Sequence, residues 1–164
     1  MIGDEMSYGL VRASAKPRTG WGVKLIASLS LALYVLSFLL PAFKIVVDGR
    51  SEISYGYEAF VVSILYSFSP DGFTAFVPWV ANPMLWVGSI LFMRTRFASA
   101  CVAGMGACAM AATLLLRDAE SRHLLLMGYY VWVLSMVLFT VAGAIQVVWD
   151  GAEEKTAMTE AGNP

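Results

Sequence analysis

The stretch LLLMGYYVWVLSMVLFTVAGAIQVVW, residues 124–149, decides the fold because it runs for 26 residues without a charged side chain. A helix needs about 20 consecutive apolar residues to cross the hydrocarbon core of a bilayer. A charged side chain at the centre of that core costs a few kcal/mol. We therefore predict a membrane-spanning helix over about residues 124–148.

Three further stretches have the same property. Residues 25–43, 72–93 and 97–116 are uncharged over 19, 22 and 20 residues. The whole chain is 59% hydrophobic and 14% charged, whereas soluble domains average about 45–50% and 25%. These observations predict an all-α membrane protein, a four-transmembrane-helix bundle in contact with the lipid bilayer. The other three spans are expected at about residues 22–41, 73–93 and 97–116.

The connection between the first two spans, residues 42–72, is the largest predicted loop. Two β-type segments, residues 43–47 and 50–55, flank Asp48-Gly49, a dipeptide that suits a tight hairpin turn because both positions tolerate positive φ. Residues 59–70 are uncharged but too few to span. We predict a small external hairpin followed by a short interfacial helix at residues 57–69.

The distribution of Lys and Arg predicts the orientation, because basic residues in short loops are retained in the cytoplasm. Seven of them lie on the side of the two termini and of the loop containing Arg94 and Arg96, and four lie on the other side. Both termini are therefore expected in the cytoplasm. We interpret residues 1–20 as a flexible N-terminal segment and residues 150–164 as a disordered tail.

The second predicted span contains Pro78 and Pro83, with Asn82 between them. Each proline deprives the carbonyl group four residues earlier of its hydrogen-bond donor. We expect a break in the helix near residues 78–83, with the Asn82 amide satisfying the backbone there. Trp79 and Trp86 are interpreted as part of an external aromatic belt.

The third predicted span is rich in small side chains, which let helices approach closely. Ala100, Gly104, Cys108 and Ala112 form one row at every fourth position. This row is either a seam for a protein partner or second copy, or the packing face of the central helix within one bundle. Both interpretations remain open from the sequence.

Residues for redox, metal or nucleic-acid chemistry are scarce. Cys101 and Cys108 are about 10 Å apart along one helix, beyond disulfide reach. His123 is the single histidine and cannot supply paired haem ligands. The net charge of -1 offers no electrostatic footprint for nucleic acid. We expect no cofactor, no metal site and no nucleic-acid partner.

The carboxylates of the external face are the remaining candidates for chemistry, because an aspartate pair can run hydrolysis at a membrane surface. Glu58, Asp71 and Asp118 are predicted on that face, near the level of Asn82. If Glu58, Asp71 or Asp118 met Asn82 in a pocket, the alternative would be a membrane-embedded enzyme or a lipid-handling protein with a site between Asn82 and the loop 42–72.

Three short motifs carry a resemblance to a family. The chain contains SFLLPAF at residues 37–43 before a Gly-containing loop, WVANP at residues 79–83 and GYYVW at residues 128–132. In these it resembles small uncharacterised bacterial inner-membrane proteins with four helices, over about residues 25–150. The resemblance implies a location in the inner membrane and no activity.

The favoured functional interpretation is a non-enzymatic membrane protein that binds another protein. No charged side chain lies within the four uncharged runs that form the predicted spans, which argues against proton or ion transport. The external loop is also too small to fold alone. Accessory subunits of larger complexes and immunity proteins against membrane-acting toxins are both of this class.

Overall fold

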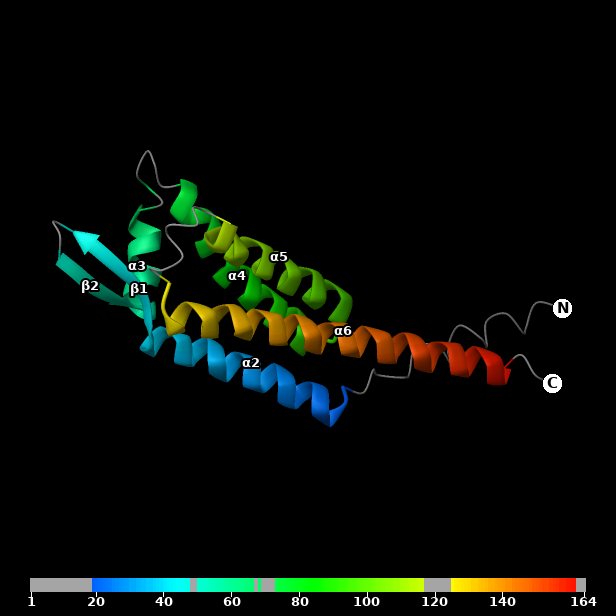
Figure 1. Ribbon diagram of the computed structural model, residues 1–164. Helices are drawn as coiled ribbons and strands as arrows, with labels where there is room; N and C mark the ends of the chain where they lie inside the picture. The colour runs from blue at the N-terminus through cyan, green and yellow to red at the C-terminus, as the bar shows by residue number, and fades with distance from the viewer. Residues whose placement is uncertain (1–18, 48–49, 67, 69–72, 117–124, 162–164) are drawn as a thin grey trace.

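The computed structural model describes residues 19–47, 50–66, 68, 73–116 and 125–161. Four long helices pack together, and a two-stranded hairpin and a short helix lie at one end of the bundle (Figure 1). The elements are α2 (Trp21–Leu39), β1 (Pro41–Val47), β2 (Arg50–Tyr55), α3 (Gly56–Tyr66), α4 (Phe73–Met93), α5 (Phe97–Leu116) and α6 (Met127–Ala161). The predicted fold class is confirmed.

Four helices are long and apolar enough to cross a membrane. They are Trp21–Leu39, Phe76–Met93, Phe97–Leu115 and Met127–Thr156. Large apolar side chains such as Leu25, Val102 and Val137 are exposed on their outer faces. Helices with such outer faces belong in lipid, where the helical conformation satisfies every backbone group internally. The chain is a multi-pass membrane protein.

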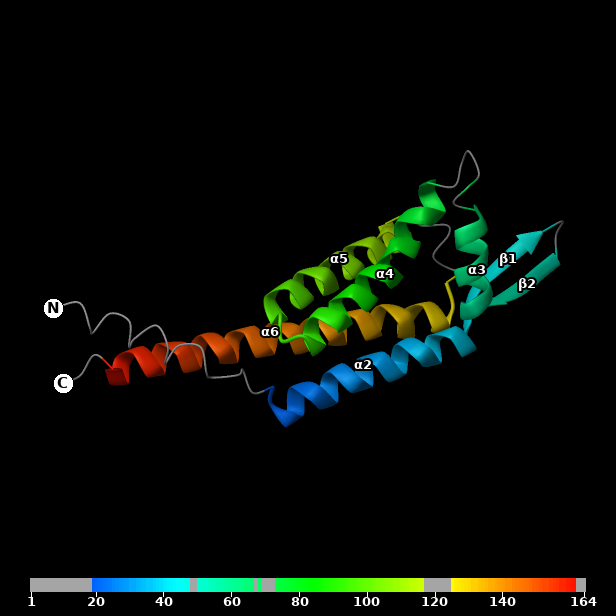
Figure 2. The same cartoon turned by 180° about the vertical axis from the view of Figure 1, so that it is seen from behind.

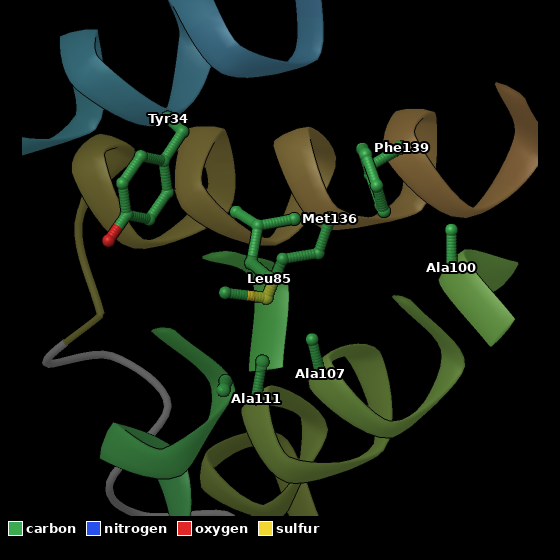
Figure 3. Packing of buried hydrophobic residues seen from close by; sticks show 8 residues of the cluster. Tyr34, Leu85, Ala100, Ala107, Ala111, Met136 and Phe139 are labelled. Atoms are coloured by element: carbon green, nitrogen blue, oxygen red, sulfur yellow. The ribbon is translucent and has the colours of Figure 1, made fainter. Parts of the chain in front are cut away.

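The helices pack in the order α2, α6, α5, α4, so α6 lies between α2 and α5 (Figures 1 and 2). Leu85, Met136 and Phe139 fill the core together with alanines of α5 (Figure 3). Gly104 sits against the backbone of Thr140 on α6, and Gly143 of α6 sits against Cys101 on α5. These two glycines permit the close approach of α5 and α6.

The hairpin and α3 form the cap, defined here as β1, β2 and α3. The strands are antiparallel, with Lys44 opposite Ile53 and Val47 opposite Arg50. The predicted second strand, residues 50–55, is confirmed, and the first begins two residues earlier than predicted. The expected turn dipeptide, Asp48-Gly49, lies outside the described residues.

Two backbone hydrogen bonds attach the cap to the bundle. The Gly56 amide donates to the Leu40 carbonyl at 3.0 Å, and the Leu126 amide donates to the Ala42 carbonyl at 2.8 Å. Gly56 lies directly against the backbone of Ser37 and Phe38. A side chain at residue 56 would push α3 away from the end of α2, so glycine is required at this contact.

The structure differs from two expectations. First, α4 is a continuous helix through Pro78 and Pro83, because Asn82 Nδ2 donates to the Trp79 carbonyl that Pro83 leaves without a donor. Second, the expected disordered tail is helical as far as Ala161. Good helix formers such as Glu153 and Lys155 extend a helix that the membrane span has already nucleated.

Candidate functional site beneath the cap

A network of uncharged polar side chains lies at the cap end of the bundle, centred on Asn82. Asn82 is 5% exposed. Its Oδ1 accepts hydrogen bonds from the Tyr34 hydroxyl at 3.1 Å and from Trp132 Nε1 at 2.9 Å. The Tyr34 hydroxyl in turn accepts from Trp86 Nε1 at 3.0 Å. The network therefore joins α2, α4 and α6 without placing a charge inside the membrane.

The position of Asn82 follows from the proline one residue later. Pro83 leaves the Trp79 carbonyl free, and Asn82 Nδ2 donates to that carbonyl at 3.0 Å. This contact leaves Oδ1 pointing at the neighbouring helices as an acceptor for two donors. The Asn82 side chain thus satisfies the free carbonyl group of α4 and also fixes the contacts of α4 with α2 and α6.

A cavity with a volume of about 70 Å³ lies between this network and the cap. It is only partly enclosed. Residues of α2, α4, α5 and α6 form its walls, and β1 and α3 contribute to its roof. The cavity is lined by Ser37, Phe38, Ala42, Phe43, Gly56, Ala59, Phe60, Ser63, Pro78, Trp79, Asn82, Leu114, Gly128, Tyr129 and Trp132.

One buried donor on a residue of the cavity lining has no acceptor among the described residues. Trp79 Nε1 is buried, and nothing in the described part of the chain accepts a hydrogen bond from it. Other donors around the cavity are used: Tyr129 donates to the Ala111 carbonyl at 2.8 Å, and Ser37 donates to the Tyr34 carbonyl at 2.6 Å. The cavity is therefore an uncharged chamber whose lining includes six aromatic residues.

The predicted polar site on the external face is only partly described. Asn82 lines the cavity, whereas Asp71 and Asp118 lie outside the described residues. Glu58 does not line the cavity, and its carboxylate instead accepts hydrogen bonds at the N-terminus of α3. Its Oε2 accepts from the Tyr55 amide at 2.9 Å, and its Oε1 accepts from the Tyr57 hydroxyl at 3.0 Å. The backbone hydrogen bond from Tyr55 lowers the pKa of Glu58, and the hydrogen bond from Tyr57 adds to the effect.

The predicted row of small residues lies mainly inside the bundle. Ala100 is fully buried, Gly104 contacts Thr140 and Phe139, and the sulfur of Cys108 is 3.6 Å from Thr140 Oγ1. Ala112, at the end of the row, is half-buried. Most of the row thus packs against α6 of the same chain, and the exposed face of α5 carries the larger Val102 and Met105.

Sequence reasoning missed the partners of Asn82. The sequence predicts no polar contact for Tyr34 or Trp132, and it assigns Trp86 only to an aromatic belt at the membrane interface. One signal could have found them: each carries a hydrogen-bonding atom inside an otherwise apolar run, and such atoms require partners in lipid. Which of these hydrogen-bonding atoms meet depends on the rotation of each helix about its axis, and the sequence does not determine that rotation.

The fold and the cavity together define a multi-pass membrane protein with an uncharged aromatic chamber at one end. No family model matches the chain, and neither does any curated protein or solved structure. Among the described residues, no group of three His, Cys, Asp or Glu side chains is placed to hold a metal ion.

Proposed function

We propose that this chain is a non-enzymatic membrane protein, an accessory subunit or an immunity-type protein, that binds another protein through its cap. The observation that carries the proposal is the outer edge of β2. Within the described residues β2 pairs only with β1, so its other edge is open to a third strand except at Tyr55, whose amide donates to Glu58. An extended segment of a partner can add to such an edge as a third strand.

The side chains around this edge suit a protein contact. Ile53 is 58% exposed and Tyr55 is 42% exposed, and the ring of Tyr55 stacks on that of Tyr57 at 6.2 Å. Aromatic and large apolar side chains are enriched in the centres of protein interfaces. Arg50 and Glu52 on the same strand are exposed and would supply a polar rim.

The lining of the cavity favours a binding role over catalysis. Its fifteen lining residues include no Asp, Glu, His, Lys or Cys. General acid–base and nucleophilic mechanisms rely on such groups, and the Ser37 hydroxyl of this lining donates to the Tyr34 carbonyl. Glu58, the described carboxylate of the predicted enzyme site, is engaged at the start of α3.

We also propose the inner membrane of a bacterium as the location, with the cap outside and both termini in the cytoplasm. The cap and the described ends of the chain lie at opposite ends of the bundle (Figure 1). The excess of Lys and Arg on the side of the termini supports this orientation, and so does the resemblance to small bacterial inner-membrane proteins.

The edge of β2 can be tested with a photo-crosslinking amino acid at Ile53 in living cells. We expect one protein to be crosslinked reproducibly, and we expect Ile53→Lys to reduce its co-purification about tenfold or more, because a charge on an edge strand opposes strand addition. Thr156→Lys, an exposed position at the far end of α6, serves as the control and should leave co-purification unchanged. Crosslinking only to lipid, or only to a second copy of the chain, would contradict the proposal.

A further inference from the structure

We propose that a groove between α2 and α4 binds one acyl chain of an anionic phospholipid, and that Lys24 at the mouth of the groove pairs with the phosphate group of that lipid. The groove has a volume of about 480 Å³. It lies towards the end of the bundle opposite the cap, where α2 begins and α4 ends (Figure 1). Because the groove is separate from the edge of β2, the proposal does not depend on the protein-binding proposal.

The packing of the helices explains why the groove is open. α2 packs mainly on α6, and α4 packs mainly on α5. The hydrogen bonds between α2 and α4 in the described residues lie near the cap, where the Tyr34 hydroxyl donates to Asn82 and accepts from Trp86. Further from the cap, Ser30 donates to the Ser135 carbonyl of α6 at 2.7 Å. There α2 is attached to α6, and the groove separates it from α4.

The depth of the groove matches the acyl-chain region of one leaflet. Its mouth is at the ends of the spans, because Lys24 is the fourth residue of α2 and Thr95 lies two residues beyond α4. Leu31, which also lines the groove, lies ten residues into the span Trp21–Leu39, or about 15 Å at 1.5 Å per residue. The hydrocarbon core is about 30 Å thick, so the groove reaches from one surface to about its middle.

The size of the groove fits a single acyl chain. Its volume of about 480 Å³ is roughly three times that of the 150 Å³ cavity that accommodates benzene in another protein. Benzene has six carbon atoms, so by the same proportion the groove holds roughly 18–20 carbon atoms. One chain of a membrane lipid has about this size, and the second chain would remain in the surrounding bilayer.

The lining within the membrane favours an acyl chain over water. The side chains of Ala27, Leu31 and Phe92 offer no hydrogen-bonding group. The hydroxyl of Ser89, a polar residue of the lining, donates to the Leu85 carbonyl at 2.8 Å. A water molecule needs about two to four polar partners to remain at such a depth. An acyl chain needs none and gains dispersion contacts with the apolar side chains.

The mouth of the groove favours an anionic headgroup. Among the described residues that line the groove, Lys24 is the only charged one, and the lining contains no Asp or Glu. A lysine side chain can lay its apolar stem along the protein and hold its ammonium group at the level of the headgroups. Arg94, between the lining residues Met93 and Thr95, is exposed and adds a second positive charge near this end of α4. These charges complement a lipid phosphate.

The proposal can be tested with full-length protein in vesicles that contain phosphatidylglycerol with a photoreactive diazirine in the middle of one acyl chain. Crosslinked peptides are mapped by mass spectrometry. We expect the crosslinks to concentrate on the groove residues Ala27, Leu31 and Ser89. Fewer crosslinks are expected at Val102 and Val141, which are exposed on α5 and α6. Photoreactive phosphatidylcholine with the same chains should label the groove about fivefold less, because its headgroup has no net charge for Lys24 to attract.

Two variants separate the contribution of the charge from that of the groove. Lys24→Gln should lower labelling of the groove by phosphatidylglycerol about fivefold, the effect of one basic residue at a membrane surface. Lys155→Gln, the same change at an exposed position of α6, is its matched control and should leave labelling unchanged. Ser28→Leu places a larger side chain in the groove and should lower labelling by both lipids. Ser99→Leu, at an exposed position of α5, is the control for that variant.

Three outcomes would overturn the proposal. An even distribution of crosslinks among Leu31, Val102 and Val141 would show that the groove binds lipid no better than the rest of the outer surface does. Equal labelling of the Lys24→Gln and Lys155→Gln variants by phosphatidylglycerol would remove the phosphate contact. A groove that stays unlabelled while Val102 and Val141 react would contain another occupant, such as a second copy of the chain. Each result leaves the protein-binding proposal intact, because that proposal concerns the edge of β2.

Discussion

At the scale of single residues, Asn82 makes the largest number of connections between elements. Its side chain bonds to Tyr34 on α2, to Trp132 on α6 and to the Trp79 carbonyl of its own helix. Hydrogen bonds between membrane helices contribute about 0.6–2 kcal/mol each. Replacing Asn82 by Leu, which has a similar volume, removes all three and leaves buried polar groups without partners.

We expect Asn82→Leu to lower the free energy of unfolding by roughly 2–5 kcal/mol. The measurement is unfolding in mixed micelles with a rising fraction of denaturing detergent, followed by tryptophan fluorescence. Ser89→Ala is the control, because Ser89 donates only to the Leu85 carbonyl of its own helix. If both variants unfolded at the same detergent fraction, Asn82 would not be the connection between the helices that the structure indicates.

Thr95 has a backbone conformation that is unfavourable for a residue with a Cβ atom. It has a φ of 59° in the turn between α4 and α5. There its amide donates to the Phe92 carbonyl and the Arg96 amide donates to the Leu91 carbonyl, the pattern of a Schellman motif with Thr where glycine is usual. A residue with a Cβ in this conformation costs about 1–2 kcal/mol relative to glycine.

Thr95→Gly is therefore expected to stabilise the protein by about 1 kcal/mol, after the greater freedom of glycine in the unfolded chain is subtracted. Thr156→Gly is the matched control. That exposed position on α6 is helical, where glycine destabilises by roughly 0.5–1 kcal/mol. The two variants should therefore shift the thermal midpoint of unfolding in detergent in opposite directions. A lower midpoint for Thr95→Gly would contradict the argument.

At the scale of elements, the N-terminus of α3 depends on a charged side chain, Glu58. Glu58 accepts the Tyr55 amide at the start of the helix, as the third residue of a helix often does for the residue before it. This bond lowers the pKa of Glu58 from its usual 4.5. The stabilisation is therefore fully present above pH 4.5 and is lost as the pH falls through the lower pKa of the folded state.

We expect the amide protection of α3 to decrease below about pH 4 relative to its value at neutral pH, as measured by hydrogen exchange corrected for intrinsic rates. Glu58→Gln keeps an acceptor oxygen but cannot titrate, so its protection should be lower at neutral pH and should not change with acid. Protection that falls equally in both proteins would show that another group controls α3.

The helices themselves could be predicted from the sequence because one quantity, the length of each uncharged run, determines where a chain can cross a bilayer. The contacts between the helices could not be predicted in this way. Within their membrane spans, helices such as α5 and α6 are apolar on every side, so no amphipathic face marks the interior. The meeting of Tyr34, Asn82 and Trp132 and the cavity beside them depend on helix rotation, which packing and hydrogen bonds determine.

At the scale of the whole molecule, the helices place the cap at one end and Lys24, Arg94 and Lys155 towards the other. If basic residues are retained in the cytoplasm, the cap is outside. An impermeant maleimide applied to intact cells should therefore label Ser51→Cys, an exposed residue of β2. Thr156→Cys should be labelled only after the membrane is permeabilised.

The unmutated chain is the control for this labelling experiment, because Cys101 and Cys108 lie within the span Phe97–Leu115 and are only partly accessible. Labelling of Thr156→Cys in intact cells, with Ser51→Cys protected, would reverse the orientation. It would also place the edge of β2 in the cytoplasm, so a partner for that edge would have to be sought there. Labelling of both variants from the outside would be inconsistent with the observed bundle, since Ser51 and Thr156 lie at opposite ends of helices long enough to cross the membrane.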